Sequence, residues 1–169
     1  MTKTCDKCKK TSIWTDYTNK KLCETHFLEQ IEKRIRKNLR TKKLIDLKKE
    51  YTIIKDEENK HIITQHFLKK IFPNRIKLTK NKDAIKINSN TLDDETQELI
   101  EKFTKNKEIT KEIKPISVIT DEELKIIAKI LNQKVKIKPK TQDKLTKKDP
   151  QLLFSTHKSK EFIEKREKK

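Results

Sequence analysis

Three cysteines and one histidine in the first 26 residues most restrict what this chain can fold into. Two residues separate Cys5 from Cys8, fourteen separate Cys8 from Cys23, and two separate Cys23 from His26. Two close pairs of ligands joined by a loop are typical of tetrahedral zinc sites. Three thiolates and one imidazole complete the coordination sphere, so we predict a closed, structural Zn²⁺ site. The alternatives are iron at the same ligands, or cysteines that share no site.

The zinc site would use all 3 cysteines of the chain. We therefore expect neither nucleophilic sulfur chemistry nor an iron–sulfur cluster. An odd number of cysteines beside a histidine fits a reducing compartment, and the N-terminus has no apolar stretch of the kind found in signal peptides. The sequence thus predicts a cytoplasmic protein that does not enter a membrane.

The absence of glycine excludes several nucleotide-binding and catalytic loops. The chain has 0 glycines, whereas the P-loop, the dinucleotide fingerprint and the nucleophile elbow all need them. Hydrophobic residues make up 31% of the chain and charged residues 41%, so we expect a small core.

Basic residues outnumber acidic ones, and the net charge is +18. The excess lies in residues 1–50 and 134–169, while residues 51–133 are nearly neutral. Such a distribution favours binding to a polyanion, of which RNA and DNA are the commonest in cells.

A long basic helix is predicted directly after the zinc site. Leu28, Ile31, Ile35 and Leu39 follow one another at spacings of three and four, which places them in one apolar stripe. The other faces are rich in cations, which either form a solvated surface or contact phosphate groups. These candidate nucleic-acid contacts are Lys33, Arg34, Arg36, Lys37, Arg40, Lys42 and Lys43.

The rest of the pattern indicates a helix-rich α/β fold. A strand at Tyr51–Ile54 precedes a helix that ends before Pro73, and two short strands are expected at 75–79 and 84–88 with a turn between them. Thr91 and the acidic residues after it predict a helix start. Thr120 and Glu123 predict a capping box at the start of another helix.

We expect four segments along the chain. They are a zinc knuckle at 1–27, a basic connecting helix at 28–50, an α/β domain at 51–133 and a lysine-rich segment at 134–169. Within the last segment, residues 134–148 are either a linker or a phosphate-binding arm, and a short strand at 152–154 precedes a basic helix around Phe162.

The N-terminal motif reads Cys5-Asp6-Lys7-Cys8, then Leu22-Cys23-Glu24-Thr25-His26-Phe27, and it leads into the basic helix. This opening resembles that of the tRNA 2-thiolation ATPases, a branch of the PP-loop superfamily (adenine nucleotide alpha hydrolase-like). Residues 91–97 are similar to the family's Asn-Leu-Asp-Asp-Glu-Ala-Gln segment. Weaker similarity follows at Lys114-Pro115-Ile116 and at 149–165. The resemblance implies a reduced, Rossmann-like PP-loop domain that has kept its N-terminal zinc finger.

Departures from the family pattern imply a loss of catalysis. The position of the family's Ser-Gly-Gly-x-Asp-Ser loop reads Asp56-Glu57-Glu58-Asn59-Lys60-His61, and these carboxylates would repel a triphosphate. The region of the family's central cysteines is also missing. The resemblance therefore implies a degenerate, non-catalytic relative, a pseudoenzyme that needs neither ATP nor an iron–sulfur cluster. It would bind zinc, together with tRNA or an intact thiolation enzyme.

Two alternatives remain open from the sequence. The chain could be a subunit of an active, ATP-dependent tRNA sulfurtransferase whose partner supplies the missing loop, with Asp93 and Asp94 near a nucleotide or magnesium ion. It could also be an unrelated zinc-knuckle protein that binds nucleic acid in translation or transcription.

Overall fold

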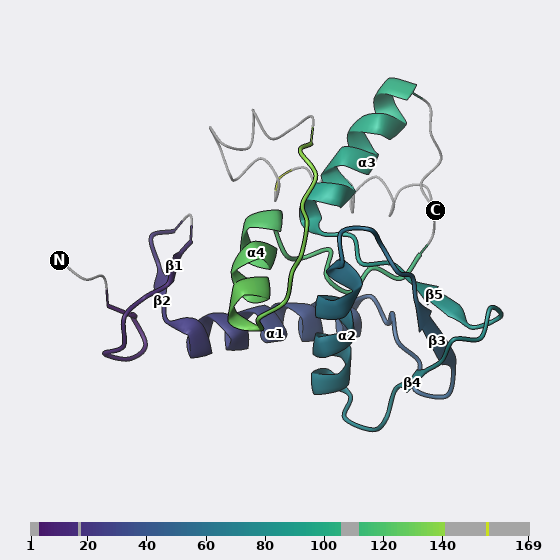
Figure 1. Cartoon of the computed structure of the whole chain (residues 1–169), viewed down its shortest axis with the longest axis horizontal. Coiled ribbons are helices and arrows are strands. Elements are labelled where there is room, and N and C mark those ends of the chain that lie inside the picture. The colour runs from purple at the N-terminus through teal and green to yellow at the C-terminus, as the bar shows by residue number, and fades with distance from the viewer. Residues whose placement is uncertain (1–3, 17, 106–111, 141–154, 156–169) are drawn as a thin grey trace.

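A computed structural model describes residues 4–16, 18–105, 112–140 and 155. The strand expected at 152–154 and the helix expected around Phe162 lie outside the described residues. The described part is a mixed α/β structure, as predicted, with a short N-terminal hairpin, a small parallel sheet and helices packed beside it (Figure 1). None of its helices is long and apolar enough to span a membrane.

The N-terminal hairpin leads directly into the longest helix. Strands β1 (Trp14–Thr15) and β2 (Lys21–Leu22) pair antiparallel. Helix α1 spans Glu24–Thr41 and begins four residues before the predicted apolar stripe, because the extended backbone of Cys23 provides its N-cap. The stripe itself is confirmed: Ile31, Ile35 and Leu39 are buried.

The sheet holds three parallel strands in the order β4-β3-β5. They are β3 (Glu50–Ile53), β4 (Lys77–Leu78) and β5 (Ile85–Ile87). The two strands expected at 75–79 and 84–88 therefore exist, but each pairs with β3 and not with the other. Tyr51 is the shared neighbour, opposite Leu78 on one side and Ile85 on the other. Local alternation predicts a strand, whereas its partner depends on distant contacts.

Three further helices complete the described fold: α2 (Lys60–Ile71), α3 (Leu92–Lys105) and α4 (Asp121–Ile130). The predicted capping box of α4 is confirmed, because the Thr120 side chain accepts from the Glu123 N–H while the Glu123 carboxylate accepts from the Thr120 N–H. Thr91 and Asp94 make the same reciprocal pair of contacts at the start of α3. Such caps satisfy backbone donors that lack partners within the helix.

One hydrophobic core joins the metal-ligand segment to the α/β part. It contains Leu22, Phe27 and Ile31 from the N-terminal segment, Tyr51 from the sheet, and Ile127 from α4. Trp14 adds a tilted ring contact with Phe27, with 5.1 Å between ring centroids. Because these residues share one core, a disturbance of the hairpin should reach the sheet and α4.

Asparagine occupies most of the backbone positions with a left-handed conformation, which glycine often occupies in other proteins. Positive φ occurs at Asn19, Asn59, Asn74 and Asn132, and also at Lys43. Asparagine tolerates this region better than other residues with a Cβ atom. Lys43 follows α1, where the N–H of Leu44 donates to the carbonyl of Leu39 over 3.0 Å. This arrangement ends α1 well before residue 50.

Candidate functional site

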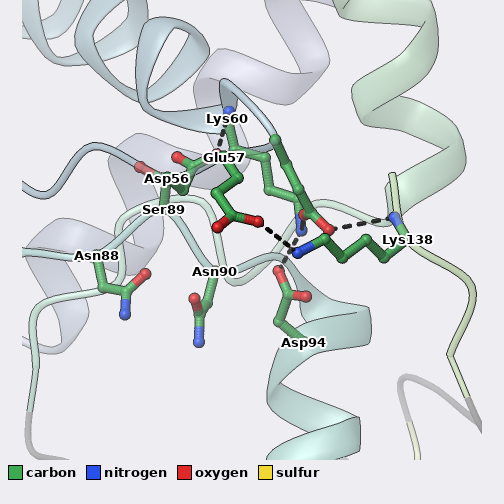
Figure 2. A pocket seen from close by; sticks show the side chains of 9 residues that line it. Asp56, Glu57, Lys60, Asn88, Ser89, Asn90, Asp94 and Lys138 are labelled. Carbon is green, nitrogen blue, oxygen red and sulfur yellow. Dashed lines mark hydrogen bonds and ion pairs between the residues drawn. The ribbon is translucent and has the colours of Figure 1, made fainter. Parts of the chain in front are cut away.

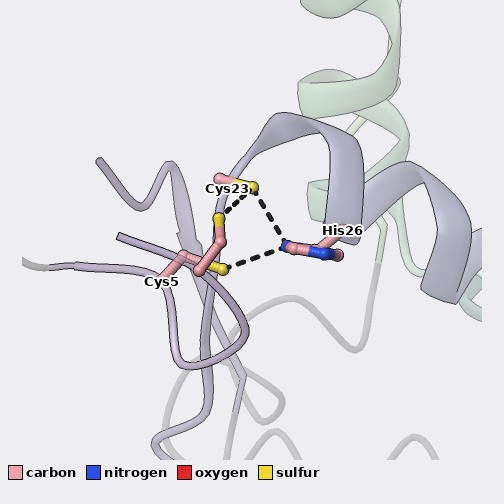
Figure 3. Close-up of side chains that lie close together, drawn as sticks. Cys5, Cys23 and His26 are labelled. Atoms are coloured by element: carbon pink, nitrogen blue, oxygen red, sulfur yellow. Dashed lines mark hydrogen bonds between the residues drawn. The ribbon is translucent and has the colours of Figure 1, made fainter. Parts of the chain in front are cut away.

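The four predicted metal ligands lie together at the start of α1 (Figure 3). Cys5 and Cys8 come from the loop before β1, Cys23 caps α1, and His26 occupies its first turn. Their ligand atoms all lie within 4.8 Å of one another, and they are the one such group in the part of the chain that the structure describes. Cys5 is 6% exposed and Cys23 3%.

The distances between donor atoms fit a tetrahedral metal ion. Cys8 Sγ lies 3.6 Å from Cys23 Sγ, and His26 Nδ1 lies 3.4 Å from Cys5 Sγ and 3.3 Å from Cys23 Sγ. Metal–sulfur and metal–nitrogen bonds of about 2.3 and 2.1 Å place tetrahedral ligand atoms about 3.5 to 3.8 Å apart. The described side chains are thus preorganised to bind a metal ion.

The surroundings of Cys5 favour the thiolate that metals bind. Burial raises the pKa of this thiol, but contacts with the backbone of Cys23 and Lys7 and with the His26 ring lower it to about 6 overall. The N–H of Lys7 lies 3.5 Å from the sulfur. A low thiol pKa increases the thiolate fraction at neutral pH, which favours ligation.

The structure divides the seven predicted basic contacts into two groups. Six are exposed: Lys33, Arg36, Lys37, Arg40, Lys42 and Lys43. Arg34 instead turns to α4, where its guanidinium pairs with Glu123 and also donates to the carbonyl of Val118. Arg36 pairs along the helix with Glu32 but remains 54% exposed. The solvent-facing side of α1 therefore stays basic without Arg34.

A carboxylate of the chain itself fills the N-terminus of α2. Asp56 accepts hydrogen bonds from the backbone N–H groups of Lys60 and His61, each over 2.8 Å. The N-terminus of a helix that follows a parallel strand is where many α/β proteins bind phosphate. Asp56 therefore occupies the donors that a phosphate group would otherwise use.

Two lysines whose side chains are largely buried hold the acidic segments of this region together. Lys60 Nζ lies 2.5 Å from Glu58 and 2.8 Å from Asp94, while Lys140 Nζ lies 2.7 Å from Asp94 and 2.5 Å from Asp121. Burial disfavours each charge, but the opposite charges outweigh it and shift the pKa of Lys60 to about 12 and that of Asp94 to about 2. Lys60 and Asp94 are thus both charged at neutral pH.

Sequence reasoning missed this network because its partners are distant in the chain. Residues 134–148 read as a linker or a phosphate-binding arm, yet the part of them that the structure describes contacts the loop after β3. The Lys136 N–H donates to the Glu58 carbonyl over 2.9 Å, and Lys138 Nζ pairs with Glu57 over 2.8 Å. No local pattern around Lys140 distinguishes it from the exposed lysines near it.

A hollow of about 300 Å³ lies beside these ion pairs (Figure 2). It is lined by Asp56, Glu57, Glu58, Lys60, Asn88, Ser89, Asn90, Asp94 and Lys138. Most of the charged groups in it are already paired with one another. The Ser89 hydroxyl is buried and has no hydrogen-bond partner in the described part of the chain.

The chain has no match among protein-family models or curated proteins, but it resembles a solved structure. The structure is that of the U34-tRNA thiolase NcsA from Methanococcus maripaludis, solved with its [4Fe-4S] cluster. The TM-score is 0.73 at 15% sequence identity, over 96% of this chain and 88% of that one. This chain therefore shares its α/β fold with that thiolase, and it carries an N-terminal Cys₃His cluster.

The comparison corrects the expected cofactors. We expected Zn²⁺ without an iron–sulfur cluster, because one site would use all the cysteines. The similar thiolase, however, holds a [4Fe-4S] cluster. Thiolates and imidazoles also ligate iron–sulfur centres, so assigning the cysteines to one metal site does not exclude a cluster. The exclusion was wrong because it treated this donor set as specific for zinc.

Proposed function

We propose that this chain binds tRNA through α1 and takes part in tRNA thiolation beside an intact thiolation enzyme, without catalysing the reaction itself. The observation that carries the proposal is the exposed basic side of α1 next to the Cys₃His cluster, on a fold shared with a tRNA thiolase. Lysine and arginine side chains along a helix suit phosphate contacts, which provide affinity without reading the sequence.

The non-catalytic part of the proposal rests on Asp56. Its carboxylate accepts hydrogen bonds, each over 2.8 Å, from two backbone N–H groups at the start of α2. A phosphate-binding loop would need these same N–H groups to bind phosphate. The nearby cations Lys60 and Lys140 are paired with carboxylates and are less than 10% exposed. A bound triphosphate would have to break these ion pairs, which costs several kcal/mol in a buried site.

The Cys₃His cluster is proposed as a metal centre that fixes the hairpin against α1. Cys23 belongs both to the cluster and to the start of the helix, so a bound metal would hold the loop of Cys5 and Cys8 at the end of the basic surface. Zinc, iron and acid-labile sulfide measured on the purified protein identify the metal.

The test of tRNA binding compares two charge-matched variants. Replacing Lys33, Lys37 and Arg40 by Gln removes three exposed cations of α1, while replacing Lys77, Lys80 and Lys82 by Gln removes three exposed cations near β4. We expect the α1 variant to bind tRNA at least about tenfold more weakly at about 0.1 M salt, with a shallower salt dependence. Equal affinities for the two variants would contradict the proposal.

Two other measurements test whether the chain acts beside a partner enzyme. We expect tRNA and a thiolation enzyme to co-purify with the tagged chain from its native cells at low salt. We also expect equilibrium dialysis to detect no ATP bound to the isolated chain. ATP binding by the wild-type chain, with Asp56 in place, would instead support an active enzyme subunit.

A further inference from the structure

The exposed end of α2 continues the basic side of α1. Lys69 and Lys70 lie in the last turn of α2 and are both exposed. Lys70 Nζ lies 3.1 Å from a carboxylate oxygen of Glu32 on α1, and the other oxygen of Glu32 lies 2.5 Å from Arg36. Arg36 of α1 and Lys70 of α2 are therefore exposed neighbours that share Glu32. Figure 1 shows α2 crossing α1 in this view.

Glu32 fixes the positions of Arg36 and Lys70 and neutralises only part of their positive charge. Its side chain is 18% exposed, whereas Arg36 and Lys70 are 54% and 47% exposed. One carboxylate between two cations leaves a net positive charge, and holding both side chains lowers the entropy lost when they bind a partner. Burial raises the pKa of Glu32, but Arg36 and Lys70 lower it overall, so the carboxylate stays ionised at neutral pH.

We propose that an RNA backbone docks along a ridge made by both helices, with Lys69 and Lys70 of α2 as phosphate contacts beside Arg36 and Arg40 of α1. We call these four residues the α1–α2 ridge. The inference rests on the proposed function and extends its RNA surface to a helix that the sequence did not single out. Phosphates repeat along a nucleic-acid strand, so exposed cations on two neighbouring helices can contact more of them than one helix face alone.

RNA is the occupant because the ridge offers cations without an apolar centre. The exposed neighbours on this side of α2 are Gln65 and His66, both polar. Protein–protein interfaces bury an apolar core surrounded by polar residues, and lysine is depleted in them. Contacts to phosphate and sugar need no such core and account for most hydrogen bonds of nucleic-acid complexes.

The test compares a variant that lacks the two α2 cations with a control variant that lacks two exposed lysines elsewhere. The Lys69→Gln/Lys70→Gln variant is compared with Lys80→Gln/Lys82→Gln, whose exposed lysines lie between β4 and β5. Binding of fluorescent tRNA is followed by anisotropy over a range of salt concentrations. We expect the first variant to lose about tenfold in affinity and its log–log salt slope to fall by about 2, and the second to stay within about twofold of wild type.

A charge-preserving variant separates electrostatics from folding. The Lys69→Arg/Lys70→Arg protein keeps both charges, so we expect it to bind within about twofold of wild type. If wild type binds tRNA with marked salt dependence and the Gln variant binds equally well, the ridge is wrong while the proposed function stands. If wild type shows no such binding, both are wrong, and binding to an acidic protein instead would also overturn both.

Discussion

The guanidinium of Arg34 on α1 forms a two-point ion pair with Glu123 on α4, over distances of 2.6 and 2.7 Å. Glu123 is 3% exposed and also closes the capping box of α4. The pair thus joins α1 to the first turn of α4. It also turns the Arg34 guanidinium away from the surface that would meet RNA.

Replacing Arg34 by Ala should destabilise the fold and spare RNA binding. The variant leaves the buried carboxylate of Glu123 without its cation, which we expect to cost about 2 kcal/mol in the free energy of unfolding. Urea denaturation measures this loss, and tRNA affinity of the folded variant should fall by less than about threefold. A stable variant with weak tRNA binding would show instead that Arg34 contacts RNA directly.

Replacing Lys43 by Gly should stabilise the protein. Lys43 has φ of 48°, a left-handed conformation that glycine adopts without steric cost. We expect an increase of about 1 kcal/mol in the free energy of unfolding, measured by urea denaturation. Asn132→Gly is the control: its φ is 52°, but asparagine tolerates this region, so the change should stay below about 0.5 kcal/mol. Equal gains in both variants would remove the steric explanation.

Removing one ligand of the Cys₃His cluster should release the metal and weaken the whole core. We expect Cys23→Ser to lower metal content from about one site per chain to near zero, and to lower the melting temperature by more than about 5 °C, since the hairpin shares its core with the sheet. Thr25→Ser, an exposed change in the same turn, is the control. Metal retained at the wild-type level would disprove the ligand assignment.

The buried carboxyl of Asp93 should make stability depend on pH. Burial and the nearby Asp121 carboxylate raise its pKa from 3.8 to about 6, despite the hydrogen bond from the Asp121 N–H. The folded protein therefore holds this proton more tightly than the unfolded chain. The stability that Asp93 contributes is fully present below about pH 4 and is lost as the pH rises from there through about 6.

Asp93→Asn tests this dependence, because an amide oxygen can still accept from the Asp121 N–H. We expect the variant to exceed wild type in the free energy of unfolding by about 2 kcal/mol at about pH 7.5, by about half of that at about pH 5, and by much less at about pH 3.5. Comparing the two proteins at each pH cancels other titrating groups, including the metal ligands. A difference that does not change with pH would mean that Asp93 titrates near its ordinary pKa.

The sequence by itself determined the features that depend on near neighbours. The spacing of Cys5, Cys8, Cys23 and His26 predicted a group that the structure brings together, and the spacing of apolar residues predicted the buried stripe of α1. The Thr120 and Glu123 capping box also followed directly. Helical periodicity, caps and paired ligands act over a few residues, so they can be recognised before the fold is known.

Tertiary structure alone decided which charges are buried and which strands are neighbours. Arg34 and Lys37 are both cations of α1, yet Arg34 meets Glu123 while Lys37 stays exposed. Lys140 resembles the lysines before it, yet its side chain is only 9% exposed and lies between Asp94 and Asp121. These partners lie between 19 and 89 residues away along the chain. Burial of a charge depends on whether a distant opposite charge arrives beside it, and packing of the whole core determines that.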